Sequence, residues 1–565
     1  MNKSRDELAV FQSRLRQIHW LHWIALSAIV VVYLLLVVRL HPRNFFGLSQ
    51  DDTLYFSSAK AIADGQGYVS PSIPGTPPAT KYPVLYPWIL SWVWRWNPSF
   101  PANLSSALTL HLAFGVAYLI AAFVFLRRLP GISSTAALVL TAVCAVNPIV
   151  LFLSSNLMSD IPFAAVALSA CIIAVKANEK EARARTTVFS GILSGLSILI
   201  RAMGVPLAAG LFVAIALRNG WRRSAVFAAC VLPFSVALLW RSVFLTAKLP
   251  PVASSSCSQS WRMTWLYYTS YAGFWSADVF SNDVFWQTVA SNLRSILVQP
   301  GLYFLKGTYV RPAILAVVLL IVLSAVAIRG LVRLAKLSGW QPIYFALAFS
   351  ILPMLIWDYS IMGRFLIPFL PLLCAAIWTE VRQTVSNLWH TPGREGGADR
   401  KIAAGFLCLS GAVLCWCIGI SWWGEIHAVA RISESRAALL DEKRAAYAWL
   451  EQKTAPNSRI LAYEDASVFL YSGRQSLRPV IFSAAGVYRP DILNSELACI
   501  VSSAKPLSAN YWVVSDDDFF AEWDPARSRA HEREEEIERM IHPLFRSEHG
   551  GVRIYKLDAD GEPAR

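Results

Sequence analysis

The first apolar run of this chain is Trp20-Leu-His-Trp-Ile-Ala-Leu-Ser-Ala-Ile-Val-Val-Val-Tyr-Leu-Leu-Leu-Val-Val-Arg-Leu40. A helix of about 20 mainly apolar residues spans the hydrocarbon core of a bilayer. The leader before the run is long, and no small-x-small cleavage motif follows it. A secretory signal peptide would have a shorter apolar region and such a motif. The run therefore predicts an uncleaved membrane anchor.

Similar runs recur along the 565 residues, of which 55% are hydrophobic and 16% charged, with a mean hydropathy of +0.44. Soluble domains carry about 25% charged residues. The sequence therefore predicts a polytopic α-helical membrane protein with about eleven transmembrane helices. The predicted spans are 20–40, 104–126, 133–151, 161–176, 187–201, 203–217, 224–245, 309–328, 341–357, 364–381 and 402–422. Arg201, Gly204 and Pro206 break the stretch 187–217, so we expect two short helices there.

Lysines and arginines set the expected orientation. They lie in the leader and in every second loop: Lys3, Arg5, Arg14, Arg16; Arg127, Arg128; Lys176, Lys180, Arg183, Arg185; Arg218, Arg222, Arg223; Arg329, Arg333, Lys336; Arg382, Arg394, Arg400 and Lys401. Because short cytoplasmic loops are enriched in these residues, eleven crossings place the N-terminus in the cytoplasm. The 41–103 loop, the 246–308 loop and the C-terminal tail then lie outside the inner or plasma membrane. These loops also explain the net charge of +14, so we expect membrane lipid, and no nucleic acid, as a partner.

The tail from about Gly424 differs from the rest. Its pattern predicts strands at 459–463, 511–514 and 552–556, with helices at 433–452, 466–471 and around 532–540. We therefore expect two parts, a transmembrane module (1–423) and a small extracytoplasmic α/β domain (424–565). Of nine cysteines, only Cys257 and Cys499 lie outside the apolar runs, so the extramembrane cysteines can pair at most once.

The 41–103 loop contains Ser49-Gln-Asp-Asp-Thr-Leu-Tyr55, which suits the start of a short helix at the membrane interface that ends near Gly65. Asp51 and Asp52 then stand in its first turn. Taken alone, these residues favour a helix cap, because acids there satisfy free N–H groups and the helix dipole. A catalytic carboxylate pair is the alternative.

A proline-rich stretch, 71–87, stiffens the chain around Lys81 and Tyr82. Lys81 is suited equally to holding an anionic ligand and to meeting lipid headgroups. Trp88, Trp92 and Trp96 follow at helical spacing and predict an aromatic interface helix.

Three charges lie within or beside apolar runs. Asp160 precedes a span, where it serves as a cap or as part of a site. Arg201 lies in the broken pair of helices, and either a functional role or an ion pair with Asp160 would explain it. Arg364 opens a span, where it anchors the interface or grips phosphate with its two-pronged guanidinium.

Two further clusters invite a functional reading. The stretch 261–275 is rich in aromatic residues, which favours a headgroup belt over stacking on a sugar. The acidic run 516–518 favours a solvated turn before a helix over a metal site.

In order along the chain, these stretches resemble the GT-C glycosyltransferases of the protein O-mannosyltransferase and lipid A aminoarabinose transferase type. The motifs are Asp51-Asp-x-x-Tyr55-x-x-x-Ala59, Gly65-x-Gly-Tyr68, Lys81-Tyr-Pro-x-x-Tyr-Pro87, Asn156-Leu-Met-Ser-Asp-Ile-Pro162, Ile198-Leu-Ile-Arg-Ala-Met-Gly204, Gly363-Arg-Phe-Leu-Ile-Pro-Phe-Leu-Pro371 and Val468-Phe-Leu-Tyr-Ser-Gly-Arg474. Ile200 stands where the family commonly has Thr. Each motif alone is weakly specific, but the ordered set covers most of the chain.

The resemblance implies a GT-C fold and an inverting transfer of a hexosyl or pentosyl unit from a polyprenyl phosphate donor. The acceptor would be a protein, a lipid or a glycan. Asp51 matches the family's base, which must take the proton of the acceptor hydroxyl. Asp52 falls where relatives often have Glu, and Asp160 matches an acidic residue of the second outer loop.

A phosphate leaving group needs cations, and Lys81, Arg364 and Arg201 are the candidates. Tyr55 and Tyr82 belong to the substrate loop. The first loop has no Asp-x-Asp motif, so we expect no metal. A transporter or flippase of lipid-linked glycans, a polymerase or ligase of such glycans, and a membrane sensor are the rival functions.

The odd number of spans predicts that residues 424–565 lie outside the cytoplasm. Alkaline phosphatase fused to the C-terminus should be active, and a reporter that fluoresces only in the cytoplasm should stay dark. The opposite pair of results would overturn the topology.

Overall fold

The computed structural model describes residues 20–179, 183–245, 257–281, 284–357, 363–390, 397–501 and 504–558. Within these ranges, seven helices are long and apolar enough to cross a membrane. They are α2 (Trp20–Arg39), α5 (Leu104–Arg128), α8 (Asp160–Ala177), α11 (Trp221–Phe244), α15 (Ala313–Ala335), α17 (Leu370–His390, preceded by the 3-10 helix η3, Gly363–Phe369) and α18 (Gly397–Lys453).

Four further apolar segments complete the bundle. The helices α6 (Ser134–Ala145) and α7 (Pro148–Ser155) are together long and apolar enough for one span but are bent by 55°, as in a broken span or a re-entrant loop. Three apolar helices are shorter: α9 (Ala184–Ile200), α10 (Gly204–Asn219) and α16 (Gln341–Met354). Together with the seven long helices, they correspond one to one to the eleven predicted spans, and the chain is a multi-pass membrane protein.

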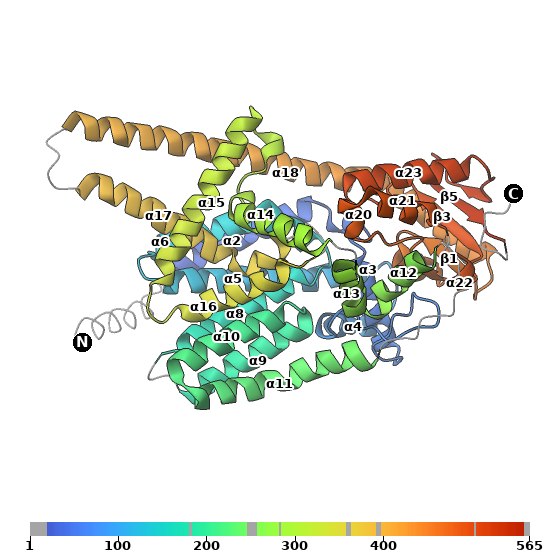
Figure 1. The fold of residues 1–565 in the computed structure, drawn as a ribbon, viewed down its shortest axis with the longest axis horizontal. Coiled ribbons are helices and arrows are strands. Elements are labelled where there is room, and N and C mark those ends of the chain that lie inside the picture. The colour runs from blue at the N-terminus through green and yellow to red at the C-terminus, as the bar shows by residue number, and fades with distance from the viewer. Residues whose placement is uncertain are drawn as a thin grey trace.

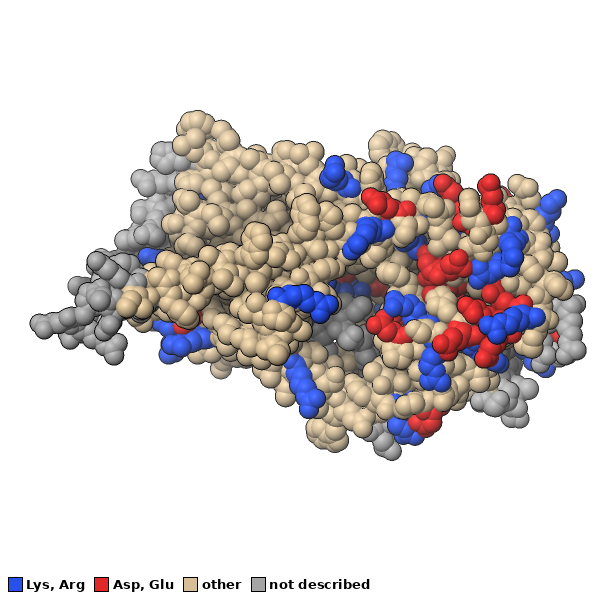
Figure 2. Space-filling view, turned by 90° about the horizontal axis from the view of Figure 1, so that it is seen from above, with Lys and Arg blue, Asp and Glu red and all other residues tan. Residues whose placement is uncertain are grey.

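The exposed surface around the helical bundle is apolar. On α11, for example, Leu232, Leu239 and Trp240 are 60%, 61% and 56% exposed. An apolar surface of this extent suits lipid and would promote aggregation in water. Figure 2 shows charged side chains gathered over the C-terminal domain, while the bundle surface in that view is largely uncharged.

The break between α9 and α10 confirms the two short helices expected at 187–217. Arg201 ends α9 in an extended conformation, and Gly204 begins α10. A Cβ atom at Gly204 would lie 2.4 Å from the backbone nitrogen of Ile198. Only glycine therefore lets α10 begin so close to α9 and leaves Arg201 in the gap.

The connecting segments 40–103 and 257–281 lie at one end of the bundle, next to the C-terminal domain, whereas residues 285–302 pack along α15 (Figure 1). The first contains η1 (Pro42–Phe45), α3 (Asp51–Ala63) and α4 (Leu85–Trp96); the second contains α12 (Ser258–Thr269) and α13 (Tyr271–Ser281), and it is followed by α14 (Phe285–Leu302) and η2 (Gly307–Tyr309). On α4, Trp88, Trp92 and Trp96 are exposed, as an interface helix requires. The helix α3 differs from its prediction: its side chains are mostly buried, and it packs on α4 and on the C-terminal domain.

The C-terminal domain is built on a mixed five-stranded sheet with strand order β2-β1-β3-β5-β4. Its strands are β1 (Arg459–Ala462), β2 (Gln475–Leu477), β3 (Tyr511–Ser515), β4 (Phe545–Arg546) and β5 (Val552–Lys556), and its helices are α19 (Asp465–Ser472), α20 (Ala485–Tyr488), α21 (Pro490–Ala498), α22 (Ala504–Leu507) and α23 (Asp524–Glu538). β1 pairs in parallel with β2 and β3, whereas β5 is antiparallel to β3 and β4. The three predicted strands are confirmed, and β2 and β4 are additional.

The helix α18 joins the two parts of the chain. It runs without interruption from residue 397 to 453, through Gly424, so the predicted span and the predicted polar helix are one rod (Figure 1). Ala446, Tyr447 and Leu450 near its end pack on one face of the sheet. The opposite face, which includes Trp512 and Tyr555, packs with α21 and α23.

The acidic run 516–518 forms the turn that we expected before α23, but only Asp516 is exposed to solvent. Asp517 forms an ion pair with Lys443 of α18, whose Nζ lies 2.6 Å from Asp517 Oδ1, and it also pairs with Arg436. Both cations contact Glu464 as well, at 2.7 and 3.1 Å. The cluster is buried between α18 and the sheet, where partners on distant segments compensate each charge. Sequence spacing alone cannot reveal such partners.

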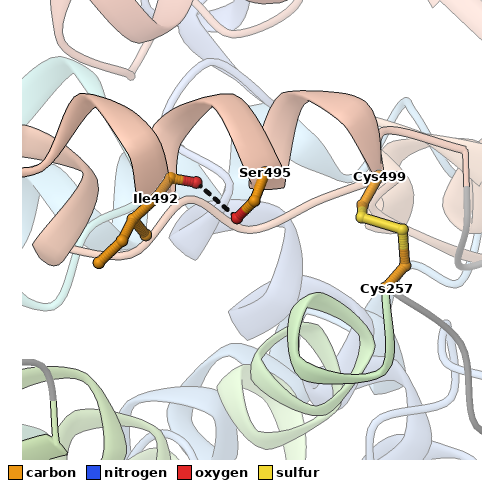
Figure 3. The surroundings of a disulfide bond; sticks show 4 residues. All are labelled: Cys257, Ile492, Ser495 and Cys499. Carbon is orange, nitrogen blue, oxygen red and sulfur yellow. Dashed lines mark hydrogen bonds between the residues drawn. A yellow bond between two sulfur atoms is a disulfide. The ribbon is translucent and has the colours of Figure 1, made fainter.

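Cys257 and Cys499 form a disulfide that ties the start of α12 to the end of α21 (Figure 3). Their Cα atoms are 5.6 Å apart, and 242 residues separate them in the sequence. In Figure 3, Ser495 of α21 donates a hydrogen bond to the carbonyl of Ile492, one turn before Cys499. The second connecting segment is thereby fixed covalently to the C-terminal domain.

Candidate active site

A cavity of about 560 Å³ lies where the bundle, the connecting segments and the C-terminal domain meet. The helical bundle lines the cavity with Arg201, Met203, Pro353, Trp357 and Arg364. The connecting segments, together with α14, contribute Gln50, Asp51, Tyr55, Lys81, Tyr82, Tyr267, Tyr271 and Asn292. The C-terminal domain contributes Arg478, Phe482, Tyr488, Glu522 and Trp523. Of the eight residues singled out from the sequence, six line this cavity. Asp160 lies directly behind it, and Asp52 points elsewhere.

Asp51 lies in the first turn of α3 and faces the cavity. The Tyr82 hydroxyl donates a hydrogen bond to one of its carboxylate oxygens, and Arg364 Nη1 lies 3.6 Å from the other. Burial raises the pKa of Asp51, but the charges of Arg364 and Lys81 and the Tyr82 hydrogen bond outweigh burial and hold that pKa below its usual value. Asp51 is therefore ionised at neutral pH and able to accept a proton.

Asp52 caps the backbone instead. Its carboxylate accepts hydrogen bonds from the N–H groups of Gly47 and Thr53, both at 2.9 Å. Burial raises the pKa of Asp52 to about 7, although these two hydrogen bonds lower it. The capping interpretation thus fits Asp52, whereas the Asp51 carboxylate contacts Tyr82 and Arg364 in the cavity.

Asp160 and Arg201 form an ion pair with Arg201 Nη1 2.9 Å from Asp160 Oδ2. Arg201 also donates to Ser159 Oγ at 2.9 Å, and the Tyr55 hydroxyl lies 2.9 Å from the same oxygen. Arg364 Nε lies 4.0 Å from Asp160 Oδ1. Asp160 is therefore held between two guanidinium groups, as the ion-pair alternative for Arg201 predicts.

Lys81 lies inside the cavity rather than at a lipid surface. Its Nζ is buried, has no hydrogen-bond acceptor among the described residues, and stands 3.3 Å from the centroid of the Tyr267 ring. Burial lowers the pKa of Lys81 to about 7, although the charge of Asp51 raises it. A cation in this position, over an aromatic face and without an acceptor, is suited to an incoming anion.

The structure adds residues that the sequence did not single out. Arg478 extends from the C-terminal domain, donates from Nε to the Tyr463 carbonyl at 3.0 Å, and pairs with Glu522 at 3.5 Å. The sequence motif that ends at Gly473-Arg474 lies four residues before Arg478 and therefore points to this part of the C-terminal domain. Arg474 itself donates to backbone carbonyls and does not line the cavity.

The aromatic stretch 261–275 does not form the headgroup belt that we expected but lies against the C-terminal domain and the cavity. Trp261, Trp265 and Tyr268 are buried against the C-terminal domain. Tyr267 and Tyr271 line the cavity. Over the described part of the chain, no group of three or more His, Cys, Asp and Glu side chains is arranged to hold a metal ion.

The Asp160–Arg201 pair should behave as one buried unit. Replacing Arg201 by Met leaves a buried carboxylate short of a partner and should lower the free energy of unfolding by about 3–5 kcal/mol. Adding Asp160→Asn to Arg201→Met should recover most of this loss in denaturant or thermal unfolding of the purified protein. Arg95→Met on the exposed face of α4 is a control that should be silent. Fully additive losses in the double variant would contradict the pairing.

No protein-family model matches the sequence, and no curated protein matches it either. Among solved structures, ArnT from Cupriavidus metallidurans bound to undecaprenyl phosphate aligns with a TM-score of 0.50 at 11% identity, over 96% of this chain and 99% of that one. The oligosaccharyltransferase of Archaeoglobus fulgidus, in complex with Zn and sulfate, aligns with a TM-score of 0.49 at 14% identity, over 86% of this chain and 68% of that one. The likeness to ArnT covers both chains almost entirely, so this chain shares the fold of that structure, as the resemblance in its sequence predicted.

Proposed function

We propose that this chain is an inverting glycosyltransferase that moves a hexosyl or pentosyl unit from a polyprenyl phosphate to an acceptor hydroxyl on the outer face of the membrane. One observation carries the proposal: the Asp51 carboxylate faces the same cavity as Lys81 and Arg364. Group transfer from a phosphate ester needs this combination of one base and several cations.

In the proposed reaction, the acceptor oxygen attacks the anomeric carbon from the side opposite the phosphate. The new C–O bond forms as the bond between that carbon and the phosphate oxygen breaks, which inverts the centre. The proton of the acceptor hydroxyl passes to a carboxylate oxygen of Asp51. The Tyr82 hydroxyl and Arg364 hold this carboxylate in place.

The leaving group is a phosphate that gains a negative charge as its bond to the sugar breaks. Lys81 and Arg364 line the cavity and would bind this charge, so no general acid is required. Arg201 supports the site indirectly, because its ion pair keeps Asp160 beside Arg364. Asp160 thereby orients the Arg364 guanidinium, and Asp52 fixes the start of α3.

The cavity also suits a lipid-linked donor. Met203, Pro353 and Trp357 give it an apolar side among membrane helices, where a polyprenyl tail would lie. The ArnT structure that shares this fold is bound to undecaprenyl phosphate. The disulfide between Cys257 and Cys499 supports an outer location, because structural disulfides persist in oxidising compartments. Nucleotide sugars are generally absent there.

The central test uses purified protein, a polyprenyl phosphate sugar and the corresponding nucleotide sugar. We expect transfer from the lipid-linked donor and none from the nucleotide sugar. Asp51→Asn keeps the size of the side chain but removes the base, so turnover should fall by about two to four orders of magnitude. Mass spectrometry of the glycosylated product measures both effects.

Asp64→Asn is the matched control, because Asp64 lies in an exposed ion pair with Lys60 at the other end of α3. It should leave transfer unchanged. Near-normal transfer by Asp51→Asn, or efficient transfer from the nucleotide sugar without lipid, would refute the proposal. Movement of the lipid-linked sugar across vesicles without transfer would instead identify a flippase.

Binding of the donor phosphate should depend on pH through Lys81. Because burial lowers the pKa of Lys81 to about 7, the free protein loses this positive charge as pH rises through about 7. Affinity for undecaprenyl phosphate should therefore fall between about pH 7 and pH 9 in wild type, by up to tenfold per pH unit. Lys81→Arg stays charged and should flatten the dependence. An equally steep fall in Lys81→Arg would show that another group is responsible.

A further inference from the structure

Gln50 stands immediately before Asp51 in an unusual backbone conformation, with φ 56° and ψ −44°. Residues with a side chain rarely adopt positive φ, and such conformations persist only where surrounding contacts enforce them. The backbone of Gln50 would therefore favour negative φ, and contacts elsewhere in the fold must hold it at positive φ.

The opposing contacts come from the side chain of Gln50. Its Nε2 donates to the Tyr268 hydroxyl at 2.8 Å and to Asp465 Oδ1 at 3.2 Å. Its Oε1 accepts from the Tyr267 hydroxyl at 3.1 Å. Gln50, Tyr268 and Asp465 are 3%, 2% and 0% exposed, so water does not compete for these hydrogen bonds. Tyr267 and Tyr268 belong to α12, and Asp465 begins α19 of the C-terminal domain.

The backbone of Gln50 sets the start of α3. Its carbonyl accepts from the N–H of Leu54 at 3.1 Å and from the Thr53 hydroxyl at 2.8 Å. These bonds make Gln50 the residue from which the first turn is built. Asp51 is the first residue of that turn, so the direction of its side chain follows from the conformation of Gln50.

We propose that Gln50 is a positioning residue through which α12 and the C-terminal domain aim the Asp51 carboxylate into the cavity. The inference rests on the proposed function for its catalytic meaning. The placement of Asp51 itself can be measured without any transfer reaction. Gln50 thus gives the C-terminal domain a specific part in the site, besides forming one wall of it.

Three variants separate the possible causes. Gln50→Met keeps the length of the side chain but removes its three hydrogen bonds. Gln50→Gly also removes them, and it relieves the backbone strain because glycine adopts positive φ freely. Tyr268→Phe removes one acceptor of Gln50 together with the hydrogen bond between the Tyr268 hydroxyl and Asp465. Gln66→Met, at an exposed turn of the same segment, is the matched control.

The first measurement is an infrared titration of protein with isotope-labelled aspartate in nanodiscs. The Asp51 band is the one that Asp51→Asn removes. The charged or titratable groups around Asp51 are Arg364, Lys81, Tyr82, Arg201, Tyr55, Tyr267 and the neighbouring Asp52. In Gln50→Met and Gln50→Gly the carboxylate should turn away from the cations among these groups, so its band should titrate at a higher pH than in wild type and in Gln66→Met. An Asp51 band that does not move in either variant would overturn the inference.

The second measurement is transfer from the lipid-linked donor. Gln50→Met should lower kcat by about tenfold to a hundredfold, the loss expected for a displacement of the order of 1 Å, with little change in the Kd for undecaprenyl phosphate. Tyr268→Phe should lose less. Gln50→Gly should unfold at a temperature no lower than that of Gln50→Met and yet remain slow, because the hydrogen bonds matter rather than the strain. Equal losses of kcat, donor affinity and thermal stability in Gln50→Met would show a merely structural role. Wild type that transfers no sugar would refute the proposed function alone, because the infrared shift is measured independently of transfer.

Discussion

The site depends on one guanidinium shared by two buried carboxylates. Arg364 lies 3.6 Å from Asp51 and 4.0 Å from Asp160, and Arg201 neutralises the far side of Asp160. Two carboxylates so close together would repel each other and cost much solvation energy without these cations. The break between α9 and α10 places Arg201 beside Asp160, and η3 places Arg364 within reach of both acids.

Much of this arrangement is readable in the sequence because its causes are local. A membrane span needs a continuous apolar run, and a broken pair of helices needs Gly204 and a charge beside it. The strands β1 and β3 are short, mainly apolar runs, and β5 mixes apolar with basic residues, all three bounded by polar turns. The cavity residues Asp51, Tyr55, Lys81, Tyr82, Arg201 and Arg364 were found through ordered motifs, and the structure brings them together although they lie up to 313 positions apart, from Asp51 to Arg364.

The parts that the sequence did not reveal depend on distant partners. Asp517 has the pattern of an exposed turn, and only Lys443 and Arg436 on α18 make it a buried ion. Tyr267 and Tyr271 belong to a stretch whose composition also suits a lipid interface, and the C-terminal domain is what encloses it. Arg478 lies four residues beyond a recognised motif and directly after the three-residue strand β2, which is too short to show an alternating pattern. In each case, the local sequence indicates the type of side chain, but contacts with residues far away in the sequence determine whether that side chain is buried or exposed.

The domain side of the cavity, from Arg478 to Trp523, has a consequence for how the protein is made. These residues follow the apolar helices of the bundle in the chain, so they can close the cavity only after those helices have been synthesised. A chain that stops before Arg478 keeps the apolar helices of the described part but lacks this wall of the cavity. A truncation within the C-terminal domain is therefore expected to open the cavity even where the helical bundle is intact.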